Sequence, residues 1–298
     1  MIRGLALLGM LVLGMASAAR AAEPTAPERC AQTPAMAMAL SRLARPDAGL
    51  MIAAHRGAHS RAPENSLAAI EDAIAAGGEI VEIDVAVTKD GTPVLMHDRK
   101  VDRTTTGEGV VEDKTASEVA ALRLKQRDGR IADAPPPTLA QALAVACGRI
   151  LVDLDLKSDR LRPIVETVNA SGMRATSLYF DSDPAILASV RALDPAARLM
   201  VRFTTDLPLA DLLRITGPAQ VVHADPESLT PETRDAIARL GARVWLNSLG
   251  DADQRLVSGD DVGVRALLSM GASILQTDAV FALVALRGAD LSKESSRR

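Results

Sequence analysis

Acidic side chains alternate with branched apolar ones in two short segments of the chain. Residues 80–85 read Ile-Val-Glu-Ile-Asp-Val, and residues 152–157 read Val-Asp-Leu-Asp-Leu-Lys. Successive side chains of an extended strand point to opposite faces, so the polar residues of each segment share one face. The polar residues on these two faces are Glu82, Asp84, Asp153, Asp155 and Lys157.

The four carboxylates need a neutralising partner if their strands lie inside a folded domain, because an unpaired buried charge is too costly to be tolerated. Two interpretations are open: a network of salt bridges to Lys157, or a divalent cation held by carboxylate oxygens. One lysine cannot balance four carboxylates. The residues therefore favour one hard cation, Ca²⁺ or Mg²⁺, as the cofactor.

Two histidines stand close in sequence to the acidic segments. His55 opens the triplet His-Arg-Gly, and His97 is followed by Asp. Imidazole is the side chain best suited to proton transfer near neutral pH, and the planar guanidinium of Arg56 suits a phosphate. An acid–base pair, an oxygen-ligated metal and a phosphate clamp together indicate phosphodiester cleavage. We assign no chemistry to the other two histidines, His59 and His223.

The elements that must position these residues are short apolar segments alternating with segments of helical periodicity. Capping residues precede several helical segments, among them Asn65, Asp183 and Thr230. Eight strands in strict alternation with helices describe a parallel sheet that closes on itself. The predicted fold is α/β, a (β/α)8 TIM barrel over residues 51–290. Strands are predicted at 51–55, 80–87, 150–157, 176–180, 199–203, 220–224, 243–247 and 273–276.

One long segment, about residues 98–137, interrupts this alternation after the second strand. Long loops inside compact domains are usually functional, so we interpret it as a loop and helical insertion above the barrel mouth. Catalytic residues of such barrels lie at the C-terminal ends of the strands. Because His55 and His97 both follow strands, we expect them at this mouth.

The N-terminus combines Arg3, a short apolar run and small residues ending in Ala-Arg-Ala. This order predicts a secretory signal peptide over 1–21, and the apolar run is too short for a membrane anchor. We therefore expect a periplasmic or secreted protein that is not stably inserted in a membrane. Residues 22–50 are interpreted as an N-terminal leader with one short helix, and 291–298 as a flexible tail.

The predicted compartment would allow the two cysteines, Cys30 and Cys147, to form a disulfide. Disulfides persist where the environment is oxidising, and both residues are expected at the same end of the barrel. A disulfide and a pair of unpaired, buried thiols are both compatible with the sequence.

Composition narrows the class of protein. The chain has 298 residues, of which 48% are hydrophobic, and this argues against a disordered chain. A formal charge of −4 gives no basic excess, which disfavours a nucleic-acid partner. Only 2% of the residues are aromatic, which weakly disfavours an enzyme acting at a lipid surface.

These motifs resemble the glycerophosphodiester phosphodiesterase family, and they follow one another in the family's order. The similarity spans about residues 52–278, whereas 176–222 contain no motif. The matching pieces are His55-Arg56-Gly57, Pro63-Glu64-Asn65-Ser66, Glu82-Ile83-Asp84-Val85, Thr88-Lys89-Asp90-Gly91, His97-Asp98, Arg103-Thr104-Thr105, Asp155-Leu156-Lys157, Trp245 to Asn247, and Thr277-Asp278.

The resemblance implies a role for each matched position. The third metal carboxylate of the family is usually Glu, whereas this chain has the shorter Asp155. The implied roles are acid–base catalysis by His55 and His97, substrate binding by Arg56, Lys157 and Trp245, metal binding by Glu82, Asp84 and Asp155, and support by Glu64 and Asn65. For Trp245, packing in the core is an equally good interpretation.

The implied activity is metal-dependent hydrolysis of glycerophosphodiesters to sn-glycerol 3-phosphate and an alcohol. Either a substrate hydroxyl or water can serve as the first nucleophile. A second interpretation keeps the chemistry but takes a sugar or inositol phosphodiester, or a lysophospholipid in a lysophospholipase D-like reaction. A third is a periplasmic binding protein without catalysis. The expected partner is a small-molecule phosphodiester, and the sequence leaves the oligomeric state open.

Overall fold

Eight parallel strands form a closed barrel in the computed structural model, which describes residues 30–31 and 33–295, with side chains up to residue 290. The strands are β1 (Met51–Ala54), β2 (Ile80–Val87), β4 (Leu151–Leu156), β5 (Ser177–Asp181), β6 (Arg198–Arg202), β7 (Val221–His223), β8 (Arg243–Asn247) and β9 (Ile274–Thr277). They follow one another in sequence order around the ring, in which β1 pairs with both β2 and β9. The predicted (β/α)8 fold is confirmed.

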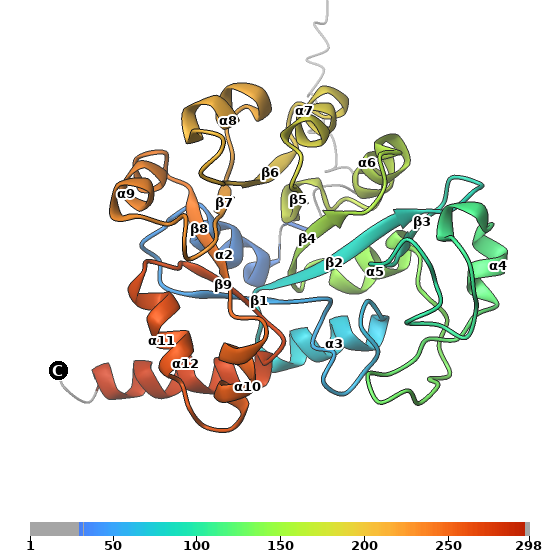
Figure 1. Ribbon diagram of the computed structural model, residues 1–298, viewed down its shortest axis with the longest axis horizontal. Coiled ribbons are helices and arrows are strands. Elements are labelled where there is room, and N and C mark those ends of the chain that lie inside the picture. The colour runs from blue at the N-terminus through green and yellow to red at the C-terminus, as the bar shows by residue number, and fades with distance from the viewer. Residues whose placement is uncertain (1–29, 32, 296–298) are drawn as a thin grey trace, which may run out of the picture.

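Helices surround the strands on the outside (Figure 1). They are α3 (Leu67–Ala76), α5 (Leu139–Ala146), α6 (Leu161–Ala170), α7 (Pro184–Leu193), α8 (Leu209–Thr216), α9 (Pro231–Arg239), α10 (Asp251–Val257), α11 (Val262–Ser269) and α12 (Val280–Ser295). No helix among the described residues is long and apolar enough to cross a membrane.

The branched residues of each strand face this ring of helices. Val81, Ile83 and Val85 of β2 belong to the large apolar cluster between strands and helices, and all three are buried. Because side chains alternate along a strand, Glu82 and Asp84 point into the barrel. The arrangement predicted for the second strand is therefore present.

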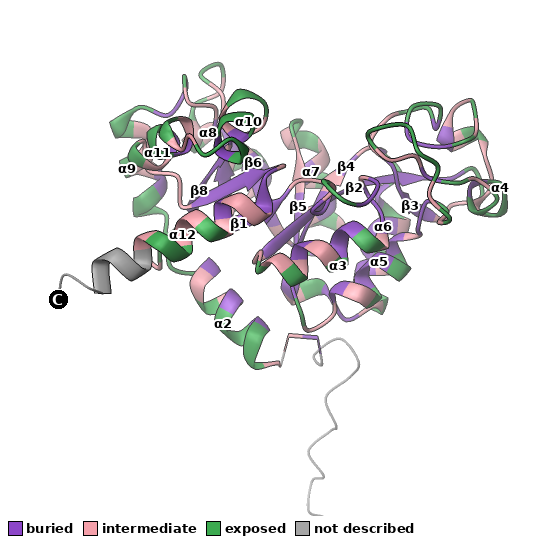
Figure 2. Cartoon of the chain, turned by 90° about the horizontal axis from the view of Figure 1, so that it is seen from below, coloured by how far each residue is buried: buried purple, intermediate pink, exposed green. Residues whose placement is uncertain are grey.

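Helix α2 (Pro34–Leu43) closes the bottom of the barrel, where the N-terminal ends of the strands meet (Figure 2). Its Met36, Ala39 and Leu43 pack in one cluster with inward-pointing residues of all eight strands. Fully buried Arg243 on β8 donates five hydrogen bonds to backbone carbonyls, four of them on residues 42–49. The leader predicted at 22–50 thus contributes a closing helix.

After β2 the chain forms β3 (Pro93–Leu95), which pairs antiparallel with β2 and leads into the long segment predicted at about 98–137, called the excursion below. A short helix, α4 (Ala116–Ala120), follows, and the segment projects beyond the barrel in Figure 1. A small apolar cluster fixes it to the extension of β2, with Ala86, Val94, Met96, Val101, Val111 and Val119 as its buried members. The excursion is therefore an ordered part of the barrel mouth.

Two boundaries differ from the expected ones. Ser66, not Asn65, caps α3: its side chain accepts a hydrogen bond from the N–H of Ala69. Helix α12 continues to Ser295, so the first residues of the segment expected as a flexible tail are helical. The predicted signal peptide, residues 1–21, lies outside the described residues.

A disulfide joins Cys30 to Cys147, the residue that ends α5. It links the leader to the barrel across 117 positions of sequence. Of the two alternatives left open by the sequence, the structure has the disulfide.

Removing this disulfide should lower stability without altering the mouth of the barrel. Because a cross-link over a long loop restricts the unfolded chain, Cys30→Ala with Cys147→Ala should lower the free energy of unfolding by about 2–5 kcal/mol. Urea unfolding followed by circular dichroism measures the change. A reductant should destabilise the wild type by a similar amount and leave the double variant unaffected; equal sensitivity of both proteins would contradict the assignment.

Candidate active site

A tight turn after β1 carries His55 and Arg56 to the mouth. Arg56 and Gly57 both have left-handed backbone conformations, with φ of 50° and 78°. A side chain at Gly57 would lie 2.7 Å from the backbone of Ala69, so only glycine fits against α3 there. The N–H of Arg56 donates to Glu82 Oε2 at 2.7 Å. The turn is thereby bound to the neighbouring strand.

Three carboxylates at the barrel mouth form one group. Glu82, Asp84 and Asp155 each offer an oxygen, and these oxygens lie within 4.8 Å of one another. Asp84 and Asp155 are register partners on β2 and β4, so strand pairing alone holds them side by side. These are the three metal ligands that the resemblance implies.

Cations balance only part of this negative charge. Lys157 Nζ lies 2.7 Å from Asp155 Oδ2 and 3.3 Å from Asp84 Oδ1, and Arg56 Nε lies 3.3 Å from Asp84 Oδ2. Among the described residues, Glu82 Oε1 and both carboxylate oxygens of Asp153 have no hydrogen-bond partner. The salt-bridge network weighed as an alternative therefore exists but leaves two buried carboxylates uncompensated.

The electrostatics of the group reflect this shortage of positive charge. Burial, together with repulsion from the neighbouring carboxylates, raises the pKa of Glu82 and of Asp153 well above the usual value. Burial would lower the pKa of Lys157, but Asp155 and Asp84 raise it above its usual value. The group as a whole favours bound positive charge.

A divalent cation fits these residues. Glu82 belongs to the group of three, and one of its carboxylate oxygens is unpartnered and available as a ligand. An all-oxygen donor set is the kind that Ca²⁺ and Mg²⁺ prefer. Glu82, Asp84 and Asp155 are therefore the residues that would hold the metal.

Asn65 fixes the position of Asp84. Its amide nitrogen donates to Asp84 Oδ2 at 2.7 Å, and its carbonyl oxygen accepts from the Asp84 N–H at 3.0 Å. Asn65 is buried and adopts a left-handed φ of 55°, which asparagine tolerates better than most residues. The supporting role predicted for Asn65 agrees with this geometry, although its capping role does not.

Each mouth histidine has a carboxylate at Nδ1. His55 Nδ1 lies 2.7 Å from Asp278 Oδ1, and His97 Nδ1 lies 2.7 Å from Asp98 Oδ1. A proton on Nδ1 leaves Nε2 as the free ring nitrogen of each histidine. Both rings contribute to the wall of the same cavity.

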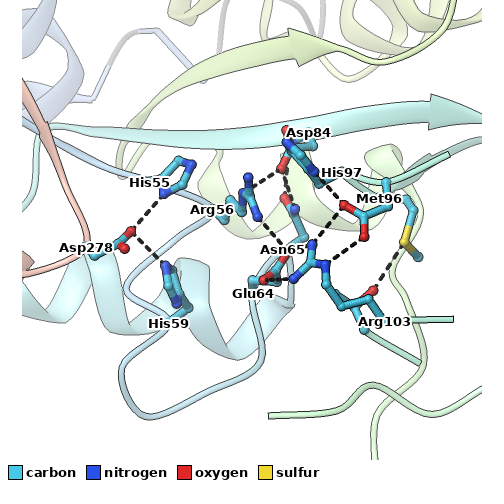
Figure 3. Close-up of polar contacts among 12 residues, drawn as sticks. His55, Arg56, His59, Glu64, Asn65, Asp84, Met96, His97, Arg103 and Asp278 are labelled. Carbon is cyan, nitrogen blue, oxygen red and sulfur yellow. Dashed lines mark hydrogen bonds and ion pairs between the residues drawn. The ribbon is translucent and has the colours of Figure 1, made fainter. Parts of the chain in front are cut away.

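Asp278 is itself firmly anchored. Its N–H donates to Asp253 Oδ2 at 2.6 Å, and its carboxylate also lies 2.9 Å from His59 Nε2. Hydrogen bonds from His55 and His59 outweigh burial and hold the pKa of Asp278 below its usual range. Figure 3 shows the two rings pointing to this carboxylate from two sides.

A second charge network holds Arg56 in place (Figure 3). Glu64 Oε1 accepts from Arg56 Nη1 at 2.9 Å, and Arg103 bridges Glu64 to Asp98. The hydrogen bond from Arg103 helps to keep the pKa of Asp98 below its usual range. Glu64 therefore has the supporting position that the resemblance implies.

The catalytic cavity measures about 210 Å³. On its far wall, Arg202 forms an ion pair with Asp225 at 2.5 Å and contacts the ring of buried His223. Burial and the nearby Arg202 lower the pKa of His223 to about 3, so this ring is neutral. Arg202 comes from residues 176–222, the part of the chain in which no motif was found.

The substrate contact predicted for Trp245 is wrong. The side chain is fully buried in the cluster at the bottom of the barrel, and its Nε1–H donates to Asn247 Oδ1 at 3.0 Å. Because stacking on a substrate requires an accessible ring face, Trp245 has the packing role that was the alternative.

Several residues of the site received no role from the sequence. Asp278 and Arg103 occur in matched motifs, and Asp278 also stands directly after a strand; these were the available signals. Arg202 and His223 end two strands, but neither they nor His59 belong to a matched motif, so no role followed from the sequence.

Replacing Asp153 by Asn should stabilise the metal-free protein at neutral and higher pH. A raised pKa means that the folded state binds a proton more tightly than the unfolded state, so stability falls as pH rises above the usual carboxyl pKa. Asp153→Asn removes this loss. Urea unfolding in chelator at several pH values should show that the variant has a higher free energy of unfolding than the wild type at pH 8, and that this difference shrinks toward pH 4. A difference that does not change with pH would mean that the buried charge of Asp153 does not cause the stabilisation.

Comparisons with known proteins agree with the geometry. A model of the glycerophosphoryl diester phosphodiesterase family matches residues 55–258. A glycerophosphodiester phosphodiesterase from Caldanaerobacter subterraneus subsp. tengcongensis is 39% identical over 110 residues, which are 36% of this chain and 45% of that protein. The matched stretches span between 21% and 57% of the length of such curated relatives.

Solved structures share the fold. A glycerophosphoryl diester phosphodiesterase from Parabacteroides distasonis has a TM-score of 0.72 and 25% identity, covering 85% of this chain and 91% of that chain. An Oleispira antarctica phosphodiesterase, solved with the product sn-glycerol-3-phosphate, has a TM-score of 0.66 and 23% identity, covering 80% and 97%.

The family match includes both mouth histidines and all three carboxylates of the group. With the closed barrel and the agreement in fold, the conclusion is that this chain belongs to the glycerophosphoryl diester phosphodiesterase family.

Proposed function

We propose that this protein is a metal-dependent glycerophosphodiester phosphodiesterase, which hydrolyses its substrate to sn-glycerol 3-phosphate and an alcohol. The observation that carries the proposal is the placement of His55 and His97, each oriented by a carboxylate, on the wall of a cavity that also contains Glu82 and Asp155. Proton transfer and charge neutralisation at one point are what phosphodiester cleavage requires.

Each histidine carries out one of the two proton transfers. One Nε2 takes the proton from the attacking water or substrate hydroxyl, whose oxygen forms the new bond to phosphorus. The other gives its proton to the departing oxygen as the old P–O bond breaks, so no strongly basic alkoxide is released. If the substrate hydroxyl attacks, the product of this step is a cyclic phosphate, which water opens in a second step of the same kind. Asp278 and Asp98 keep both rings oriented throughout, since each binds Nδ1.

Positive groups of the chain neutralise the phosphate. Arg56 presents a planar guanidinium fixed by Glu64, and Lys157 lies beside Asp155. Both side chains suit phosphate oxygens, Arg56 as a fork and Lys157 as a point charge. When bound by Glu82, Asp84 and Asp155, Ca²⁺ or Mg²⁺ supplies Lewis acidity toward the phosphoryl oxygens.

The size and polarity of the cavity favour a small soluble diester over a lipid as the substrate. The cavity is narrow, at about 210 Å³, and polar side chains from several strands reach it. The relatives named as glycerophosphodiester phosphodiesterases support the same substrate class. A sugar or inositol phosphodiester remains the second candidate, since its phosphate would meet the same groups.

The same proposal includes an oxidising compartment, the periplasm or the exterior of the cell. Its support is the disulfide between Cys30 and Cys147 together with the signal-peptide pattern of residues 1–21. Disulfides are rare where the cytosolic environment keeps thiols reduced.

Replacing either mouth histidine should abolish turnover while preserving the fold. His55→Ala and His97→Ala should each lower kcat by about 10²–10⁴-fold, the usual contribution of general acid–base catalysis. The assay measures sn-glycerol 3-phosphate released from glycerophosphoethanolamine. His223→Gln, which removes a neutral ring outside the acid–base pair, is the control and should retain much more activity; wild-type kcat in both alanine variants would refute the mechanism.

Removing the metal should inactivate the protein reversibly. Treatment with EDTA should lower kcat about a hundredfold or more, because a bound cation stabilises transition-state charge by several kcal/mol. Ca²⁺ or Mg²⁺ should restore activity, and titration calorimetry should show weaker binding to Glu82→Gln. Glu71→Gln, an exposed carboxylate on α3, should bind like the wild type. Full activity in chelator would exclude the metal from the reaction.

A further inference from the structure

A second cavity, called the outer cavity below, adjoins the catalytic cavity, called the inner cavity, at the barrel mouth. It measures about 360 Å³, and His55 and Arg56 belong to the walls of both cavities. The excursion contributes its other wall through Lys125, Gln126 and Arg127. A molecule held at His55 and Arg56 therefore has two spaces available, one inside the barrel and one under the excursion.

A hairpin holds the excursion residues in place. Lys125 N–H donates to the carbonyl of Thr104 at 2.7 Å, which binds the hairpin to the mouth. Gln126 N–H donates to Arg130 O at 2.8 Å across the turn, and the ion pair between Arg130 and Asp128 lies within the turn itself. The cavity wall is thus built by local contacts, independent of any ligand.

Two cations on this wall have no carboxylate partner among the described residues. Lys125 Nζ donates only to the backbone carbonyl of Asp102, at 3.0 Å. The guanidinium of Arg127 makes no hydrogen bond or ion pair with any described residue. The carboxylates that line the cavity, Glu64 and Asp278, are already paired with Arg103 and with the two histidines.

This positive charge is local. The chain as a whole is acidic, with a formal charge of −4, yet the outer cavity presents two unpaired cations beside the proposed phosphate site. Arginine matches a carboxylate or phosphate through paired N–H groups, and lysine attracts it as a point charge. The wall is therefore complementary to an anion.

We infer that the outer cavity binds the alcohol half of the substrate and selects alcohols that carry an anionic group, such as a carboxylate. The inference rests on the proposed function, which places the phosphate at Arg56. A phosphodiester has two arms, and the inner cavity of about 210 Å³ accommodates the glycerol arm. The second arm then extends toward Lys125 and Arg127.

Two substrates that differ by one carboxylate test this selectivity. Glycerophosphoserine carries a carboxylate that glycerophosphoethanolamine lacks, and the two are otherwise alike. The ratio of their kcat/KM values should favour the serine compound about tenfold in the wild type and should fall as salt is added. Arg127→Gln and Lys125→Gln should each reduce this ratio about threefold, as expected for one partly screened charge contact.

Arg130→Gln is the matched control: it removes the same charge from the same turn, its side chain does not line the outer cavity, and the backbone hydrogen bonds that hold the turn remain. Its ratio should equal that of the wild type, whereas Arg127→Glu should reverse the preference. A wild-type ratio near one, or an unchanged ratio in the double variant of Lys125 and Arg127, would overturn the inference alone. Failure to hydrolyse either substrate would overturn the proposed function and the inference together.

Discussion

The ion pairs that Lys157 and Arg56 make with Asp84 neutralise only part of the negative charge inside the barrel. Burial and repulsion from the neighbouring carboxylates raise the pKa of Glu82, one of whose oxygens is unpartnered. Asn65, which has a left-handed backbone conformation, donates a hydrogen bond to Asp84. A closed barrel can tolerate such a cluster because strand pairing fixes the carboxylates in register regardless of their mutual repulsion.

The rest of the barrel interior is largely apolar and contributes the stability that the polar layer does not. Below it, Trp245 and apolar residues from every strand pack against α2, so that the unfavourable charge lies between a dense apolar layer and the mouth. Arg243 and the disulfide bind the leader to this closed end. Stability and chemistry are therefore separated along the barrel axis, as is usual for this architecture.

The sequence was sufficient to predict the barrel and the position of both histidines and of the three carboxylates at its mouth, because alternation along a strand is a local property that a single chain displays. Contacts between residues far apart in sequence produce no such local pattern. Trp245 was misplaced because its residue type suits stacking and packing equally well, and only the depth of its position on β8 distinguishes them. Likewise, nothing in the sequence relates Arg202 to His223, which meet through the pairing of β6 with β7.

The contact between His55 and Asp278 joins the first barrel strand to the last, across 223 positions of the chain. The pairing of β1 with β9 is the closing seam of the ring, so this histidine acquires its orienting carboxylate only when the seam forms. A chain still missing its last strand would contain both histidines and all three carboxylates of the group, yet His55 would lack the contact that orients its ring. The proposed acid–base pair is therefore assembled only once the ring of strands has closed.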